Sequence, residues 1–223
     1  MTPGNQPLPF TATYLYLRRA IGMLSLLFPF LLVIGLYIAT DSFLLPTLSD
    51  YYHYTDVRDL FVGVLCAIGV FLWSYKGYEN SLDNIAGNIA SVSIIGTALV
   101  PNSREETNIV GWFKDTIGFN PHVILAGVFM LMMAFFCLAQ FTQTGNTAPG
   151  NEKLKRNRIY RICGWLILAC IALIIVFMLA DKYTDINLKP IENAVFWLES
   201  IAIWAFSFAW LVKGETFWRD RVS

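Results

Sequence analysis

Residues 48–63, LSDYYHYTDVRDLFVG, decide the fold of this chain, because a polar and aromatic cluster leads there directly into a long apolar run. The polar members of the cluster are Ser49, Asp50, His53, Asp56, Arg58 and Asp59. Such groups at the mouth of a hydrophobic segment are costly unless they are solvated, paired or bound to a ligand. We therefore interpret this stretch as one boundary of a membrane-spanning helix and as the first candidate for a functional site.

Composition places the whole chain in the membrane class. Its 223 residues are 56% hydrophobic and only 14% charged, whereas a soluble domain carries about 25% charged residues. The 16 basic and 16 acidic residues balance, so there is no basic excess to favour nucleic acid as a partner. Membrane lipid is the expected partner, and a homo-oligomer or a partner membrane protein is compatible with the sequence.

Six apolar runs are long enough to cross about 30 Å of hydrocarbon as helices. They are Ala20–Ala39, Val57–Tyr75, Ile85–Val100, His122–Phe141, Ile162–Ala180 and Asn193–Val212. The third run is rich in Gly, Ala, Ser and Thr, which favour close helix contact and a central position. The sequence therefore predicts an all-α fold, a polytopic membrane helix bundle with six transmembrane helices in a single domain, residues 1–223.

Basic residues predict the orientation of this bundle. With six crossings imposed, one side receives eleven of the 16 Lys and Arg residues and the other side receives five. Because cytoplasmic loops carry the excess of Lys and Arg, both termini are expected in the cytoplasm, with a bacterial inner membrane as the preferred location. Most of the acidic residues fall on the opposite, outer side.

Two loops carry further signals. Residues 102–121 have apolar positions at helical spacing, which predicts a short outer helix lying along the membrane surface. Pro121 then opens the fourth run after Asn120 as a cap, which places His122 at the outer boundary. The basic segment NEKLKRNRIYR, residues 151–161, either attracts anionic lipid or only fixes the topology.

The outer boundary gathers both histidines of the chain with most of its carboxylates. If the second helix begins a turn or two early, Ser49, His53 and Asp56 share one face. Imidazole and carboxylate groups can hold zinc and activate water, so His53, His122 and Asp56 are the predicted zinc ligands. In the competing interpretation Asp56 and Asp59 charge the start of a helix, Arg58 pairs with one of them, and His53 is only interfacial.

Glu199 is the one acidic residue placed deep inside an apolar run, about 10 Å from the outer end. An intramembrane carboxylate is expected to face the bundle interior with a partner, or to be protonated. The candidate partners are Arg58, His53 and His122, and the alternative is a structural hydrogen bond to a neighbouring helix.

The string S-D-Y-Y-H at Ser49 to His53 resembles the Ser-x-x-(Tyr or Phe)-His element of the multi-helix zinc hydrolase superfamily that includes alkaline ceramidases and the progestin and adiponectin receptors. This resemblance implies that His53 is a zinc ligand and that Ser49 orients the substrate. Those proteins also have seven helices and a C-terminal His-x-x-x-His pair, whereas this chain has no histidine after His122. The chain as a whole looks like one of the small bacterial multi-pass membrane protein families of uncharacterised activity.

The sequence is compatible with three functions. The first is a metal-dependent hydrolase acting on a lipid or an amide, with Ser49, Asp59 and Glu199 as catalytic residues beside the zinc ligands. The second is a non-enzymatic membrane scaffold or sensor subunit. The third is a cation- or proton-coupled transporter that uses Glu199, although the sequence lacks the broken helices and repeat symmetry of many transporters.

Overall fold

The computed structural model describes residues 9–75, 81–102, 116, 120–143, 150–183, 191 and 193–216. Within these residues the chain is helical and contains no strand, which confirms the all-α prediction. The long helices are α1 (Pro9–Thr40), α2 (Thr55–Ser74), α3 (Ser81–Leu99), α5 (Pro121–Phe135), α6 (Asn151–Tyr183) and α7 (Ala194–Lys213). Two short elements complete them, the 3₁₀-helix η1 (Leu48–His53) and the π-helical turn η2 (Phe136–Gln140) that continues α5.

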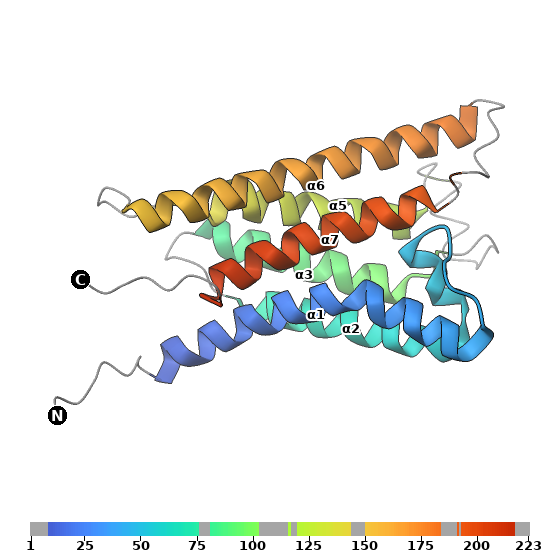
Figure 1. The fold of residues 1–223 in the computed structure, drawn as a ribbon, viewed down its shortest axis with the longest axis horizontal. Coiled ribbons are helices and arrows are strands. Elements are labelled where there is room, and N and C mark those ends of the chain that lie inside the picture. Colours follow the sequence, from blue (N-terminus) through green and yellow to red (C-terminus); the bar gives the residue numbers. More distant parts are fainter. Residues whose placement is uncertain are drawn as a thin grey trace.

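The six long helices form a closed ring (Figure 1). Each of them packs against the next one along the chain, and α1 packs against α7 to close the ring. The start of α1 and the end of α7 lie at the same end of the bundle, which we call the terminal end. The opposite end carries η1 and is called the η1 end below.

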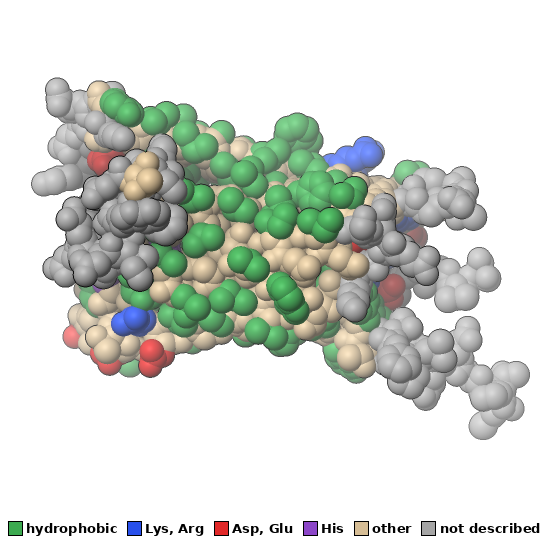
Figure 2. All heavy atoms as spheres, turned by 180° about the vertical axis from the view of Figure 1, so that it is seen from behind, with side chains coloured by type: hydrophobic (Ala, Val, Ile, Leu, Met, Phe, Trp, Pro, Cys, Tyr) green, Lys and Arg blue, Asp and Glu red, His purple; other side chains and the backbone are tan. Residues whose placement is uncertain are grey.

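All six long helices are long and apolar enough to cross a membrane. Figure 2 shows hydrophobic side chains spread over the middle of the molecule, with Lys, Arg, Asp and Glu side chains gathered toward its two ends. A belt of this kind keeps apolar side chains in hydrocarbon and charges in water. The chain is therefore an integral membrane helix bundle.

α1 and α6 extend furthest beyond the predicted apolar runs. The fifth crossing was expected to start at Ile162, but α6 starts at Asn151 and includes the basic segment. Glu, Lys, Leu and Arg are strong helix formers, and Lys155 Nζ lies 3.1 Å from Glu152 Oε1 within the same helix. α1 likewise begins at Pro9 and runs through Pro29.

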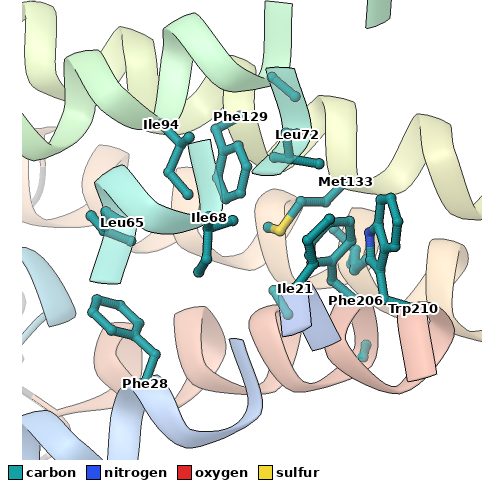
Figure 3. Close-up of a cluster of buried hydrophobic side chains, with 14 of the residues drawn as sticks. Ile21, Phe28, Leu65, Ile68, Leu72, Ile94, Phe129, Met133, Phe206 and Trp210 are labelled. Carbon is teal, nitrogen blue, oxygen red and sulfur yellow. The ribbon is translucent and has the colours of Figure 1, made fainter. Parts of the chain in front are cut away.

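Side chains from five helices share one core (Figure 3). Phe28 of α1, Ile68 of α2, Ile94 of α3, Met133 of α5 and Phe206 of α7 meet there, each no more than 3% exposed. α6 stands at the edge of this core, and only 22% of its spanning segment is buried. The ring of helices is therefore packed on the inside, and the side chains fill it.

Small residues bring α2 and α3 close together. A Cβ atom added at Gly69 of α2 would lie 2.5 Å from Ile95 Cγ1, and the Ser91 hydroxyl donates to the Gly69 carbonyl at 2.7 Å. Half of the spanning segment of α3 is buried, more than in α1, α2, α5 or α6, while α7 reaches 56%. The predicted close contact of the third crossing is therefore present. Its predicted central position was wrong, because α3 is one member of the ring, packs against α2 and α5, and leaves Leu82, Ile85 and Val92 exposed.

The predicted outer surface helix falls at residues 102–121. Most of these residues lie outside the described part of the chain, so that helix stays a prediction. The described residues do include Asn120 and Pro121, which begin α5 as expected: the Asn120 side chain accepts a hydrogen bond from the His122 backbone at 2.9 Å.

Candidate functional site

η1 is a separate 3₁₀-helix held by a capping box. The Thr47 hydroxyl accepts a hydrogen bond from the backbone N–H of Asp50 at 3.1 Å, and the Asp50 carboxylate accepts one from the Thr47 N–H at 3.1 Å. Tyr54 then adopts an extended conformation, with φ −96° and ψ 109°, before α2 starts at Thr55. The second helix therefore does not begin early enough to include Ser49 and His53, the condition for their sharing one face with Asp56, because the reciprocal caps close a short turn first.

Ser49 and His122 form a hydrogen-bonded serine-histidine pair. His122 is only 1% exposed, and its Nε2 lies 2.8 Å from Ser49 Oγ. Its Nδ1 lies 2.7 Å from the carbonyl oxygen of Val100, just after α3. A carbonyl only accepts, so we assign the proton to Nδ1, and the Nε2 lone pair accepts from the serine hydroxyl. The pair therefore connects η1, α5 and the end of α3.

Glu199 of α7 also binds η1, through a backbone group. Its Oε2 accepts a hydrogen bond from the backbone N–H of Leu48 at 2.7 Å, directly before Ser49. This contact differs from the predicted partners Arg58, His53 and His122. The first backbone N–H groups of a helical turn have no hydrogen-bond partner inside the turn. The Glu199 carboxylate accepts the hydrogen bond of one of these groups, the Leu48 N–H. The carboxylate therefore faces the bundle, as predicted.

His53 lies at the same end but in a different contact. Its side chain is exposed, and Nε2 lies 3.0 Å from the carbonyl oxygen of Asn102. Its ring meets the edge of Tyr52 at 5.8 Å between centroids. His53 is near enough to His122 for an electrostatic interaction, but the two imidazoles bind different carbonyl groups.

The acidic residues at the start of α2 remain at the surface. Asp56 and Asp59 are both exposed, and the nearby Arg58 binds the Tyr52 hydroxyl at 2.7 Å instead of a carboxylate. The Arg58 guanidinium also lies 4.4 Å from the centroid of the Tyr52 ring. In the part of the chain that the structure describes, a contact with Tyr52 thus takes the place of the expected pairing of Arg58 with an acid.

A groove of about 420 Å³ opens beside this site. Its lining residues come from η1, α2 and α3: Tyr52, Arg58, Asp59, Val62, Gly63, Ala98 and Leu99. Leu99 directly precedes Val100, whose carbonyl binds His122. The lining includes neither Ser49 nor His122, and the groove brings the charges of Arg58 and Asp59 to its wall.

Tyr51 connects η1 to the segment between α1 and η1. Its side chain is fully buried, and its hydroxyl donates to the Phe43 carbonyl at 3.3 Å. Burial raises the pKa of the Tyr51 phenol above its usual value, because the low-dielectric surroundings penalise the charged form. The phenol therefore remains a hydrogen-bond donor at neutral pH.

In the part of the chain that the structure describes, no three His, Cys, Asp or Glu side chains are grouped to hold a metal ion. Both nitrogens of His122 already have hydrogen-bond partners. A zinc ion at His122 would therefore have to displace Ser49 from Nε2, since a ligating imidazole offers a lone pair to the metal.

The sequence predicted Ser49 and His122 at the outer boundary and Glu199 about 10 Å inside it, but it did not predict the hydrogen bond between Ser49 and His122. It missed Val100 and Leu48, because both contribute only backbone atoms to the site. One sequence signal did locate His122: the Asn120-Pro121 start of α5 predicts that His122 lies at the end of the helix.

Comparisons with known protein families, with curated proteins and with solved structures find no match to this chain. The fold and the site therefore define the class on their own: an integral membrane helix bundle with a hydrogen-bonded polar site at one end.

Proposed function

We propose that this protein is a membrane-embedded hydrolase in which Ser49 is the nucleophile and His122 is the general base. One observation carries the proposal: Ser49 Oγ lies 2.8 Å from Nε2 of a buried histidine whose Nδ1 is held at 2.7 Å by a carbonyl. Nucleophile, base and a group that orients the base are the three parts of a nucleophilic serine site. The Val100 carbonyl takes the orienting role that a carboxylate has in other serine hydrolases.

The reaction follows from these contacts. Ser49 Oγ attacks the carbonyl carbon of an ester or amide while its proton passes to His122 Nε2. The bond to the leaving group then breaks, and the leaving group takes that proton from Nε2. A water molecule next gives its proton to Nε2, attacks the acyl-serine ester and releases the acid, and Nε2 returns the proton to Ser49.

The surroundings favour a lipid or lipid-like amide as substrate. The groove lined by Arg58 and Leu99 lies at the end of membrane-spanning helices, and both charged and apolar residues line it. An amphipathic substrate matches such a lining, with its chain among Val62, Ala98 and Leu99 and its polar group at Arg58 and Asp59. Glu199 acts here as a positioning residue through Leu48.

The η1 end belongs on the outer side in this proposal. The excess of Lys and Arg on the side of the termini supports a cytoplasmic terminal end. A bacterial inner membrane remains the preferred location, and the substrate is then drawn from the outer leaflet.

A fluorophosphonate probe, which phosphonylates activated serines, tests the serine proposal in detergent-solubilised full-length protein. We expect labelling of the wild type and of Ser42→Ala, which removes an exposed hydroxyl shortly before η1. Ser49→Ala should abolish labelling, and His122→Gln should slow it by about 100-fold or more, the usual contribution of a general base. Labelling of Ser49→Ala at the wild-type rate would refute the nucleophile.

The zinc form of the hydrolase, with His53, His122 and Asp56 as ligands and Asp59 as proton acceptor, is distinguished by His53→Gln. This substitution removes a metal ligand in the zinc form and leaves probe labelling unchanged in the serine form. Zinc binding of the purified protein, measured by calorimetry, should be lost in His53→Gln if the zinc form holds.

A further inference from the structure

The groove at the η1 end has a charged mouth and an apolar interior. Arg58 and Asp59 line it near the start of α2, and Gly63 lines it four residues beyond Asp59 on the same helix. Because a helix rises about 1.5 Å per residue, Gly63 lies about 6 Å deeper along α2 than Asp59. A ligand that matches this groove carries its charges at one end and hydrocarbon at the other.

Gly63 leaves the interior of the groove open. A Cβ atom added at Gly63 would meet nothing within 4 Å. From α3, the groove receives Ala98 and the 60% exposed side chain of Leu99. Deeper in the bundle the same two helices pack closely, since a Cβ atom at Gly69 would lie 2.5 Å from Ile95 Cγ1. The open space at Gly63 therefore belongs to the η1 end of this helix pair.

Tyr52 fixes the position of Arg58 at the mouth of the groove. Arg58 Nη2 donates to the Tyr52 hydroxyl at 2.7 Å, and the guanidinium lies 4.4 Å from the ring centroid. Tyr52 itself is only 7% exposed. A guanidinium carries several N–H donors in a planar fork, so Arg58 can bind Tyr52 and a phosphate at the same time. A side chain that is already held loses less conformational entropy when a ligand binds.

Asp59 supplies the opposite charge. Its side chain is exposed, and adjacent residues on a helix do not face each other, so Arg58 and Asp59 can each meet a different group of one ligand. Quaternary ammonium groups are bound by aromatic faces. Tyr52 is the one aromatic residue among the described residues that line the groove, and Arg58 already lies over its ring. Asp59 therefore favours a primary ammonium, which donates N–H bonds to a carboxylate.

We propose that the groove binds a phospholipid with an ethanolamine headgroup. Its phosphate lies at Arg58 and its primary ammonium at Asp59, and an acyl chain follows the open side of Gly63 toward the middle of the membrane. The phosphate and the ammonium of this headgroup are joined by two carbons, and the Cα atoms of adjacent residues are about 3.8 Å apart. Both charge pairs can therefore form together.

Such a lipid is also the substrate class that we infer for the proposed hydrolase. Attack of Ser49 on an acyl ester, followed by water, releases a fatty acid and a lysophospholipid. This part of the inference rests on the proposed function, whereas binding of the lipid in the groove does not.

Native mass spectrometry of the detergent-solubilised full-length protein measures the headgroup preference. Dioleoyl lipids with ethanolamine or choline headgroups are titrated separately, so that only the headgroup differs. We expect the wild type to bind the ethanolamine lipid about fivefold more tightly, equivalent to about 1 kcal/mol. Asp59→Asn should abolish this preference, and Asp41→Asn, which removes another exposed carboxylate at the η1 end, should keep it. Arg58→Gln should weaken both lipids to a similar extent, because both carry a phosphate.

Two glycines test the path of the acyl chain. Gly63→Leu fills the groove, whereas Gly127→Leu adds the same side chain to α5, at a position that likewise meets nothing within 4 Å and does not line the groove. Gly63→Leu should weaken the binding of both lipids by about tenfold or more, and Gly127→Leu should bind them like the wild type.

Three results overturn the proposal: equal affinities of the wild type for the two lipids, an unchanged preference in Asp59→Asn, or equal binding by Gly63→Leu and Gly127→Leu. The wild-type comparison needs no substitution, so it decides the headgroup preference even if a variant does not fold. If the lipid preference is found but the fluorophosphonate does not label Ser49, the hydrolase fails and the lipid site remains. The opposite result removes the lipid site and leaves the serine nucleophile.

Discussion

Glu199→Leu removes the contact that holds η1 on α7. Leucine fills a similar volume but has no acceptor, so the Leu48 N–H, now bound at 2.7 Å to Glu199 Oε2, loses its partner. A buried donor left without a partner costs about 1–3 kcal/mol. The ratio of folded to unfolded protein should therefore fall by about 5- to 150-fold.

Unfolding by sodium dodecyl sulfate in mixed micelles, followed by tryptophan fluorescence, measures this free energy. Glu199→Gln keeps an oxygen acceptor and should recover part of the loss. Ser200→Ala is the matched control, because the Ser200 hydroxyl is fully buried and has no hydrogen-bond partner in the described structure. Its removal should change the free energy by less than about 0.5 kcal/mol.

The same three variants also report on the position of Ser49. If Glu199 positions η1, fluorophosphonate labelling of Ser49 should slow in Glu199→Leu and stay normal in Ser200→Ala. The reasoning fails if Glu199→Leu and Ser200→Ala unfold at the same detergent fraction, since η1 would then not depend on the carboxylate.

Three further predictions concern the packing, the orientation and the pH dependence of the bundle. Gly69→Ala places a Cβ 2.5 Å from Ile95 Cγ1 and should cost about 1–3 kcal/mol of unfolding free energy. Gly63→Ala on the same helix meets nothing within 4 Å and should stabilise the protein or change it little. In a background without the four native cysteines, an impermeant maleimide added to intact cells should label Ser42→Cys at the η1 end and spare Gly150→Cys; the reverse pattern would reject the orientation. Burial raises the pKa of Tyr51, so the melting temperature should fall as the pH rises above about 10, where the unfolded phenol loses its proton first, and Tyr51→Phe should weaken this fall.

The helices could be predicted because a membrane leaves the backbone few choices. A long apolar run in hydrocarbon must satisfy its own hydrogen bonds, and a helix does so within one segment. All six predicted runs contain such helices. Hydropathy does not show how far a helix continues beyond the membrane into water. The start of α6 at Asn151 depends on helix propensity instead, so the apolar run did not predict it.

The site was predicted in composition but not in its contacts. Ser49, His53, His122 and Glu199 do lie at one end of the bundle, as the boundaries of the apolar runs required. His122, His53 and Glu199 bind backbone groups of Val100, Asn102 and Leu48, and the side-chain types in a sequence do not show where such backbone groups will lie. The helical spacing of Ser49, His53 and Asp56 assumed one continuous helix, and the capping box at Thr47 breaks that assumption.

The choice between the serine and the zinc form depends on one lone pair. With Nδ1 of His122 donating to Val100, Nε2 is the nitrogen left to accept a proton or a metal. A lone pair that accepts from Ser49 cannot bind zinc at the same time, so the two forms exclude each other in one molecule. Zinc bound at Nε2 would leave Ser49 without its base and slow its reaction with a fluorophosphonate, while zinc bound elsewhere would leave that rate unchanged. The nitrogen that accepts the serine proton therefore decides which chemistry this end of the bundle can perform.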